Sequence, residues 1–188
     1  MSESVAIVIP ARIGSIRVPD KNFRPCADGP SLLDRTIAFA QQLQLGPIVV
    51  TTDHLTWQHP AVVKFTRVAT AECPERPMTA VLMELLPAIE APVWLLLQPT
   101  SPFRCQLDIN RAQARLGPLT DCAFSVKRLH AGGFQADGSV YLFRRKNLEQ
   151  FGHLFGRTWS TFASHEPFGI DTPEEFAEAE RRIRQRQS

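Results

Sequence analysis

The sequence has little net charge and no long apolar run, and these two absences exclude broad classes of protein. Its 188 residues carry 21 Lys and Arg against 19 Asp and Glu, which gives a formal net charge of +2. A balance so close to zero does not create the wide positive surface that non-specific binding to nucleic acid requires. The longer apolar stretches, such as residues 93–97, are far shorter than the roughly 20 residues that cross a bilayer. We therefore expect neither nucleic acid nor a membrane as a partner.

Paired cysteines and a leader segment are also absent. There is no C-x-x-C pair and no histidine beside a cysteine at zinc-finger spacing, so structural zinc is not expected. The chain is large and apolar enough to fold without disulfides, and we predict reduced thiols at its four cysteines, Cys26, Cys73, Cys105 and Cys122. The first residues carry neither a positive cluster nor a small-residue cleavage site, which predicts a cytoplasmic protein.

Neither of the two common glycine-rich nucleotide motifs is present. The P-loop pattern G-x-x-x-x-G-K-[ST] and the dinucleotide pattern G-x-G-x-x-G both fail to match. No internal repeat and no low-complexity linker divides the chain. We therefore expect one domain over residues 1–188, with no P-loop.

Apolar runs rich in Val, Ile and Leu alternate with amphipathic stretches of helical period. Short continuous runs of this kind are typical of strands buried on both faces. The predicted strands cover residues 5–10, 48–52, 93–98, 122–126 and 139–143, and the predicted helices cover residues 31–43, 79–89, 107–116 and 172–184. The alternation predicts an α/β fold, with a mostly parallel twisted sheet and helices on both faces. Ligands bind outside the carboxyl ends of such strands, so the residues after each strand are the functional candidates.

Two of the predicted helices carry further signals. In the helix 107–116 the spacing predicts Leu107 and Ile109 facing inward and Arg111 and Arg115 facing outward. In the last helix, Thr172 is the expected N-terminal cap. The arginines near the end of that helix are expected to be a solvated helix terminus.

The loop after the first strand concentrates positive charge. Arg12, Arg17 and Lys21 lie in it, with Gly14 and Ser15 between them. Backbone N–H groups and three cations can therefore converge on one anion. The loop is a candidate phosphate site, and a surface loop with solvated charges is the alternative.

The same loop resembles a known family. Residues 9–22 form the string I-P-A-R-I-G-S-I-R-V-P-D-K-N, which is similar to the nucleotide-binding loop of the acylneuraminate cytidylyltransferases, the CMP-sialic acid synthetase family. Three further segments agree in order: V-V-T-T-D at 49–53, L-L-Q-P-T-S-P-F-R at 96–104 and G-I-D-T-P-E-E at 169–175. The string Q-P-T-S-P-x-R is highly specific, and the matches together extend over nearly the whole chain.

The resemblance implies a Rossmann-like nucleotidyltransferase fold and a cytidylyltransferase activity. Such an enzyme transfers CMP from CTP to a sugar acid of the nonulosonic type, releases pyrophosphate and uses Mg²⁺. Carried over to this sequence, Lys21 and Arg12 are the catalytic cations, with Lys21 the expected stabiliser of the transition state. The residues expected to hold CTP are Arg12, Ser15, Arg17, Lys21, Asn22 and Arg67. Those expected to contact the sugar acid are Gln98, Thr100, Ser101 and Arg104, and Mg²⁺ is assigned to Asp171.

Several of these residues also have a purely structural explanation. Gln98 and Thr100 can instead hydrogen-bond the turn that follows their strand. Asp53 can either orient the metal or nucleotide or cap the segment after it. Asp171 can be a turn residue before the last helix instead of a metal ligand.

The sequence departs from the family pattern at residues that carry the chemistry. Ile16 stands where the family has a lysine, and Gly169 stands where the first aspartate of a D-I-D string is usual. The loss of one cation and one carboxylate is expected to weaken the binding of triphosphate and metal. Asp137 or Glu166 are the candidates for a replacement carboxylate.

A second departure is a deletion. In the family, the strand that matches residues 122–126 is followed by a long excursion, which contacts the sugar acid and swaps across a homodimer. Here only residues 127–136 connect this strand to the next. We therefore expect the dimerisation arm to be missing between 127 and 136, and the protein to be a monomer or an atypical homodimer.

Three hypotheses remain for the function. The first is an active cytidylyltransferase with a reduced sugar-acid pocket, for which CTP and a sugar-acid acceptor are the partners. The second is a non-catalytic nucleotide-binding or regulatory relative. The third is a nucleotidyltransferase that uses a different nucleotide or sugar. The sequence favours the first, without naming the acid.

Overall fold

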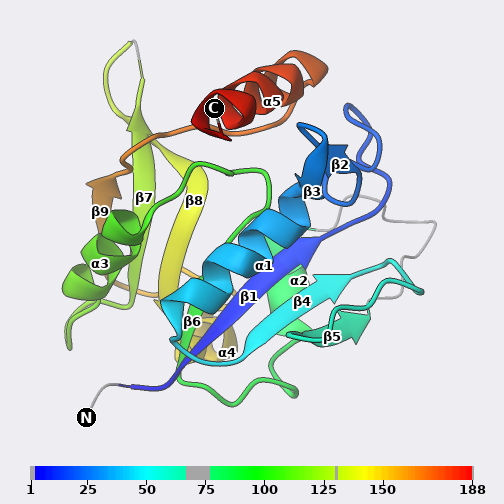
Figure 1. Ribbon diagram of the computed structural model, residues 1–188. Helices are drawn as coiled ribbons and strands as arrows, with labels where there is room; N and C mark the ends of the chain where they lie inside the picture. The colour runs from blue at the N-terminus through cyan, green and yellow to red at the C-terminus, as the bar shows by residue number, and fades with distance from the viewer. Residues whose placement is uncertain (1–2, 67–76, 130, 188) are drawn as a thin grey trace.

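A seven-stranded sheet runs through the protein. The computed structural model describes residues 3–66, 77–129 and 131–187. The strand order is β5-β4-β1-β6-β8-β7-β9 (Figure 1). The strands are β1 (Val5–Ala11), β4 (Ile48–Thr52), β5 (Val63–Thr66), β6 (Val93–Leu96), β7 (Cys122–Arg128), β8 (Phe134–Arg144) and β9 (Trp159–Ala163). Within this sheet every neighbouring pair is parallel except the two pairs that β8 makes, with β6 and with β7.

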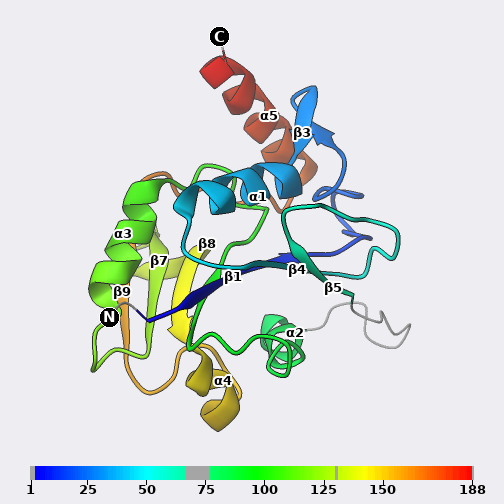
Figure 2. The same cartoon turned by 60° about the horizontal axis from the view of Figure 1, so that its bottom comes forward.

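Helices cover both faces of this sheet. They are α1 (Leu32–Leu43), α2 (Met78–Met83), α3 (Gln106–Arg115), α4 (Arg145–Phe151) and α5 (Pro173–Gln187). Figure 2 shows α1 and α3 on one side of the sheet and α2 and α4 on the other. The predicted α/β fold with helices on both faces is therefore confirmed.

The alternation of side chains along β1 explains the two layers. Successive residues of a strand point to opposite faces. Ile7 and Ile9 accordingly pack with α1 and α3 in one apolar cluster, whereas Ala6 and Val8 pack with α2 and α4 in another. All four are fully buried, which is why this strand appears in the sequence as a continuous apolar run.

A third apolar cluster joins α5 to the loops at one end of the sheet. Phe176 and Ile183 of α5 pack there with Val18, Phe103 and Ile170. The helix begins as predicted at the cap Thr172, whose Oγ1 accepts a hydrogen bond from the N–H of Glu175 at 3.2 Å. No helix in the described part of the chain is both long enough and apolar enough to span a bilayer.

Several elements differ from the sequence prediction. The predicted helix 79–89 is helical only over Met78–Met83 and continues as turns. The predicted connection 127–136 is largely a continuation of the two strands, since Lys127 pairs with Gln135 and Arg128 with Phe134. The short hairpin of β2 (Pro25–Cys26) and β3 (Gly29–Ser31) was not predicted, nor were β5, α4 and β9. These are short elements or half-exposed edge strands, so they lack a long apolar signal.

The inward face of α3 also differs from the prediction. Leu107 is 45% exposed, and the buried position is Asp108. Burial of this carboxylate is possible because its Oδ1 accepts the backbone N–H of His165 at 2.9 Å. Arg111 and Arg115 do lie on the outer side, where they donate to backbone carbonyls of the edge strand β9.

The cysteines of the described chain carry free thiols. These are Cys26, Cys105 and Cys122, whereas Cys73 lies outside the described residues. Burial raises the pKa of the Cys122 thiol to about 12. That thiol therefore stays protonated and serves packing.

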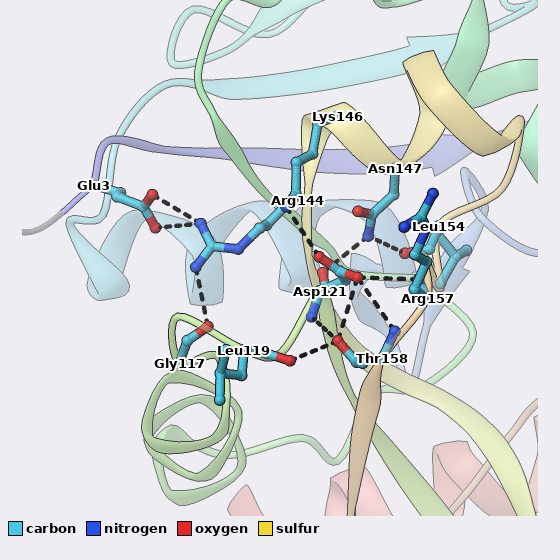
Figure 3. Close-up of polar contacts among 10 residues, drawn as sticks. All are labelled: Glu3, Gly117, Leu119, Asp121, Arg144, Lys146, Asn147, Leu154, Arg157 and Thr158. Atoms are coloured by element: carbon cyan, nitrogen blue, oxygen red, sulfur yellow. Dashed lines mark hydrogen bonds and ion pairs between the residues drawn. The ribbon is translucent and has the colours of Figure 1, made fainter.

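A polar network closes the end of the sheet that lies away from the carboxyl ends of the parallel strands (Figure 3). Asp121, before β7, accepts the backbone N–H groups of Arg157 and Thr158 at 3.0 and 3.2 Å and lies 3.1 Å from the ammonium of Lys146. Asn147 donates to the carbonyl of Asp121 at 2.9 Å. Burial raises the pKa of the Asp121 carboxyl, but the hydrogen bonds and the ammonium outweigh it and hold the pKa below its ordinary value.

Replacing Asp121 by Asn should destabilise the fold by about 1–2 kcal/mol at pH 7, because two backbone donors lose a charged acceptor. The lowered pKa means that this contribution is present above the pKa of the unfolded carboxyl, about 3.9, and is lost as the pH falls through the folded pKa. Urea denaturation should therefore show a difference between wild type and Asp121→Asn that shrinks below about pH 4.

Lys146→Ala is the control, since it removes only the exposed half of the ion pair and should cost at most about 1 kcal/mol. Equal losses in the two variants at pH 7 would show that the backbone contacts of Asp121 contribute nothing to stability.

Candidate functional site

The loops that follow β1, β4 and β6 meet at one edge of the sheet, because these three strands are parallel (Figure 1). The backbone N–H of Ile13 donates to Oδ1 of Asp53 at 2.7 Å, which joins the first two loops. The N–H of Ile170 donates to the carbonyl of Thr100 at 2.9 Å, and Lys21 Nζ donates to the carbonyl of Ile170 at 2.7 Å. Three segments of the predicted site and the start of α5 are thus held in direct contact.

The cations of the first loop lie next to the predicted metal ligand. Nη2 of Arg17 is 3.5 Å from Oδ1 of Asp171, and Nζ of Lys21 is 3.7 Å from the same oxygen. The side chain of Lys21 is only 13% exposed, whereas Asp171 is 66% exposed. Burial lowers the pKa of Lys21 and the neighbouring Arg17 and Arg12 lower it further, while Asp171 opposes both. The first loop therefore presents a largely buried ammonium beside an exposed carboxylate.

Three buried polar atoms around this loop have no hydrogen-bond partner: Ser15 Oγ, Asn22 Oδ1 and Thr51 Oγ1. Asn22 is held in place from its other side, because its Nδ2 donates to the carbonyl of Arg12 at 3.2 Å. Buried polar atoms in proteins are nearly always hydrogen-bonded, so a cluster of unpaired ones calls for an explanation. A bound polar ligand would supply the missing partners.

The loop after β6 presents a second set of polar groups. The side chains of Gln98, Thr100 and Ser101 make no hydrogen bond to the part of the chain that the structure describes. All three follow the carboxyl end of β6, at the same sheet edge as Lys21. Their amide and hydroxyl groups are therefore available for a ligand.

Arg104, which the resemblance assigns to the sugar acid, points into the protein instead. Its guanidinium donates to the carbonyls of Gln98 and Ser139 and to Oγ1 of Thr36. Burial lowers its pKa to about 9, against the opposing charges of Asp137 and Asp108. This geometry favours a role in which Arg104 holds the loop that carries Gln98, over direct contact with a substrate.

The remaining predicted residues are placed as follows. Asp53 neither caps a helix nor meets other carboxylates, and its role in the structure is to bind the backbone of the first loop. Ile16 is 71% exposed. A Cβ added at Gly169 would have no atom within 4 Å, so the missing carboxylate leaves open space. Arg67 lies outside the described residues.

Neither candidate for a replacement carboxylate reaches Asp171. Glu166 is paired with Arg182 and Arg186 of α5. Asp137 accepts hydrogen bonds from Ser125 and Ser164 and from the N–H of Ser139. Over residues 3–66, 77–129 and 131–187 no group of three or more His, Cys, Asp or Glu side chains gathers as a metal site.

Two features of the site escaped the sequence analysis. Thr51 is a fully buried polar residue in β4, and the polar pair T-T within an apolar strand was the signal that could have revealed it. The hydrogen bonds of Asp137 depend on residues from three separate strands or loops, and no spacing in the sequence indicates them.

A cavity at the opposite end of the sheet does not share these properties. It is lined by Glu3, Glu90, Pro92, Arg144, Arg145, Lys146 and Glu149. Its cations are already neutralised: Arg144 pairs with Glu3 at 2.8 Å (Figure 3), Arg145 with Glu149 at 2.9 Å and Lys146 with Asp121. The loops after β1, β4 and β6 are therefore the better candidate site.

Solved structures share this fold over nearly the whole chain. CMP:2-keto-3-deoxy-manno-octonic acid synthetase complexed with CTP is 17% identical, and the match covers 97% of this chain and 99% of that one with a TM-score of 0.69. For 2-C-methyl-D-erythritol 4-phosphate cytidylyltransferase from Thermus thermophilus the values are 17%, 95%, 98% and 0.68. For Rv0371c from Mycobacterium tuberculosis H37Rv they are 16%, 96%, 99% and 0.70. No curated protein sequence matches.

The family comparison agrees with the geometry of the site. A model of the family described as cytidylyltransferase matches residues 6–131, which is more than half of the 188 residues. The matched segment contains the loop of Arg12 and Lys21 and the loop of Gln98. The chain therefore belongs to the cytidylyltransferase family.

Proposed function

We propose that the protein transfers CMP from CTP to a hydroxyl group of a sugar acid of the nonulosonic type and releases pyrophosphate. The observation that carries this proposal is the first loop, where a buried ammonium and two guanidinium groups accompany unpaired buried oxygens. Cations suit a triphosphate, and unpaired acceptors and hydroxyls suit the polar edge of a base.

The nucleotide half of the site follows from the chemistry of these groups. Arg12, Arg17 and Lys21 would bind the phosphate oxygens, helped by the hydroxyl of Ser15. The Oδ1 of Asn22 is an acceptor without a donor. The exocyclic amino group of cytosine is a donor of the kind that it lacks, which favours CTP over nucleotides without that group. A contact from Arg67 stays a prediction.

The reaction is a displacement at the α-phosphorus. The acceptor hydroxyl oxygen forms a new bond to this phosphorus, and the bond to the bridging oxygen of the pyrophosphate breaks. The pyrophosphate leaves with the electron pair, and the hydroxyl proton passes to solvent. Negative charge grows on the leaving group and on the non-bridging oxygens, so a preorganised cation such as Lys21 lowers the barrier. Because Lys21 Nζ is nearly buried, its charge is screened little by water.

Mg²⁺ fits the donor set of this site only with the help of the nucleotide. Asp171 offers one exposed carboxylate, and Mg²⁺ is usually bound by one or two carboxylates together with substrate phosphates. When bound, Mg²⁺ would neutralise charge on the triphosphate. Among the solved structures that share the fold, Rv0371C is described in complex with manganese, at 15% identity and a TM-score of 0.67.

The acceptor half is proposed to lie at Gln98, Thr100 and Ser101. The hairpin of β7 and β8 is too short for an arm that reaches a second subunit, since only residues 129–133 separate the two strands. We therefore propose a monomer or an atypical homodimer, which light scattering distinguishes, and an acceptor bound mainly by one chain.

Lys21→Ala should lower the rate of pyrophosphate release from CTP by about 100-fold or more in the presence of Mg²⁺ and an accepted sugar acid. A coupled pyrophosphate assay over a panel of nonulosonic and related sugar acids measures this rate. Lys146→Ala removes a lysine at the far end of the sheet and should leave the rate unchanged.

The outcomes separate the three hypotheses. Pyrophosphate release that depends on CTP and a sugar acid supports the proposal. Calorimetric binding of CTP without turnover over the whole panel would contradict it in favour of a nucleotide-binding relative. A competition series in which another nucleotide displaces CTP would favour a transferase of different specificity.

Gly169→Asp should strengthen the binding of divalent cations about tenfold, because it adds a second carboxylate near Asp171 in open space. Electron paramagnetic resonance of Mn²⁺ measures the free cation, with no substrate needed. Gly117→Asp is the matched control, since a Cβ there also meets nothing within 4 Å and adds the same charge elsewhere. If both variants bind Mn²⁺ equally, Asp171 is not part of a cation site.

A further inference from the structure

Strand β8 carries a long bulge at the edge of the sheet where the site lies. Phe124 of β7 pairs with Tyr141 of β8, but Val126 pairs with Ala136. Residues 137–140 of β8 therefore face the single residue Ser125. Bulges of this kind change the direction of a strand and often aim a side chain near a functional site.

The bulge is held by a set of hydrogen bonds centred on Asp137. Its carboxylate accepts from the hydroxyls of Ser125 and Ser164 and from the N–H of Ser139 at 2.9 Å. Oγ of Ser125, which is fully buried, also accepts the N–H of Val140 at 3.0 Å. The backbone of residues 137–140 is thus fixed both from β7 and from Ser164, the residue that follows β9.

Arg104 ties this bulge to the loop after β6. Its Nε donates to the carbonyl of Ser139 at 3.1 Å, and its Nη2 donates to the carbonyl of Gln98. A planar guanidinium with fixed donor directions sets the separation of the two carbonyls more strictly than a flexible side chain would. The backbones of Gln98 and of the bulge are therefore held in one arrangement.

Gly138 lets the side chain of Gln98 lie against the bulge. A Cβ at this position would be 2.6 Å from Oε1 of Gln98 and 3.6 Å from Oγ of Ser101. The φ angle of Gly138 is +78°, in the left-handed region that favours glycine. Any other residue would push the amide of Gln98 out of its place, since a contact below 3.0 Å is not tolerated.

We propose that the bulge of residues 137–140 is a positioning device for acceptor recognition, in which Gly138 sets the direction of the Gln98 amide and Asp137 and Arg104 fix the bulge. This inference rests on the proposed function, because it takes Gln98 to contact the acceptor. The amide makes no hydrogen bond within the described residues, so its direction decides which acceptor hydroxyl or carboxylate it meets. The bulge contacts the acceptor side of the site, so its effect is on the acceptor and not on CTP.

Gly138→Ala tests the contact, and Gly132→Ala is its matched control. Gly132 lies in the same hairpin at φ +86°, but a Cβ there meets nothing within 4 Å. Both variants carry the same backbone strain, and only Gly138→Ala displaces Gln98. We expect the KM for the sugar acid to rise about tenfold in Gly138→Ala and to stay within about twofold in Gly132→Ala. The dissociation constant of CTP should change little in both.

The double variant Gln98→Ala/Gly138→Ala shows whether the two residues act together. If Gly138 acts through the amide, the double variant should have the same KM for the sugar acid as Gln98→Ala alone. Effects of the two substitutions that add up would overturn the proposal, because Gly138 would then act by another route.

A measurement without substrate keeps this inference separate from the proposed function. The side-chain amide signals of Gln98 in a ¹⁵N–¹H spectrum are assigned by their loss in Gln98→Ala. They should shift in Gly138→Ala and stay unchanged in Gly132→Ala. Failure of every sugar acid to react would contradict the proposed function, whereas equal spectra for the two glycine variants would overturn the positioning role of Gly138.

Discussion

The pairing of β1 with β4 on one side and β6 on the other is the constraint on which the site depends. Val8 is in register with Val49 and with Leu96, and all three strands run in the same direction. Parallel strands end at the same edge of a sheet, so the loops of Lys21, Asp53 and Gln98 converge. The ladder is buried, and its backbone groups have no alternative partner in water. The position of the three loops therefore follows from the core.

The loops need further contacts to keep one shape, and α5 supplies them. Its residue Phe176 packs with Val18 of the first loop and Phe103 of the loop after β6. The segment just before the helix brings the carbonyl of Ile170 to Lys21. An ammonium that is nearly buried loses hydration, and the carbonyl and Asp171 replace part of it. Packing of one helix thus helps to hold the cation that the proposed chemistry uses.

A buried charge organises the acceptor side in a similar way. Moving a guanidinium out of water is costly unless its donors are satisfied, and Arg104 meets this condition with two carbonyls and the hydroxyl of Thr36. The partners come from α1, from the loop after β6 and from the bulge of β8. Losing any of them would leave a donor of Arg104 unpaired, so the motif that contains Arg104 is explained by structure as well as by substrate.

The sequence by itself determined the layered fold, because strands buried on both faces produce continuous apolar runs, and helices such as α1 show a 3.6-residue period with a cap at Ser31. It also determined that Arg12, Lys21 and Gln98 follow strands, which placed them at one sheet edge. The tertiary structure alone decided which groups remain unpaired there, that Asp53 binds the first loop and that Arg104 turns inward. The physical reason is that hydrogen bonds between residues as far apart as Lys21 and Ile170 depend on packing of the whole chain, and no local pattern encodes them.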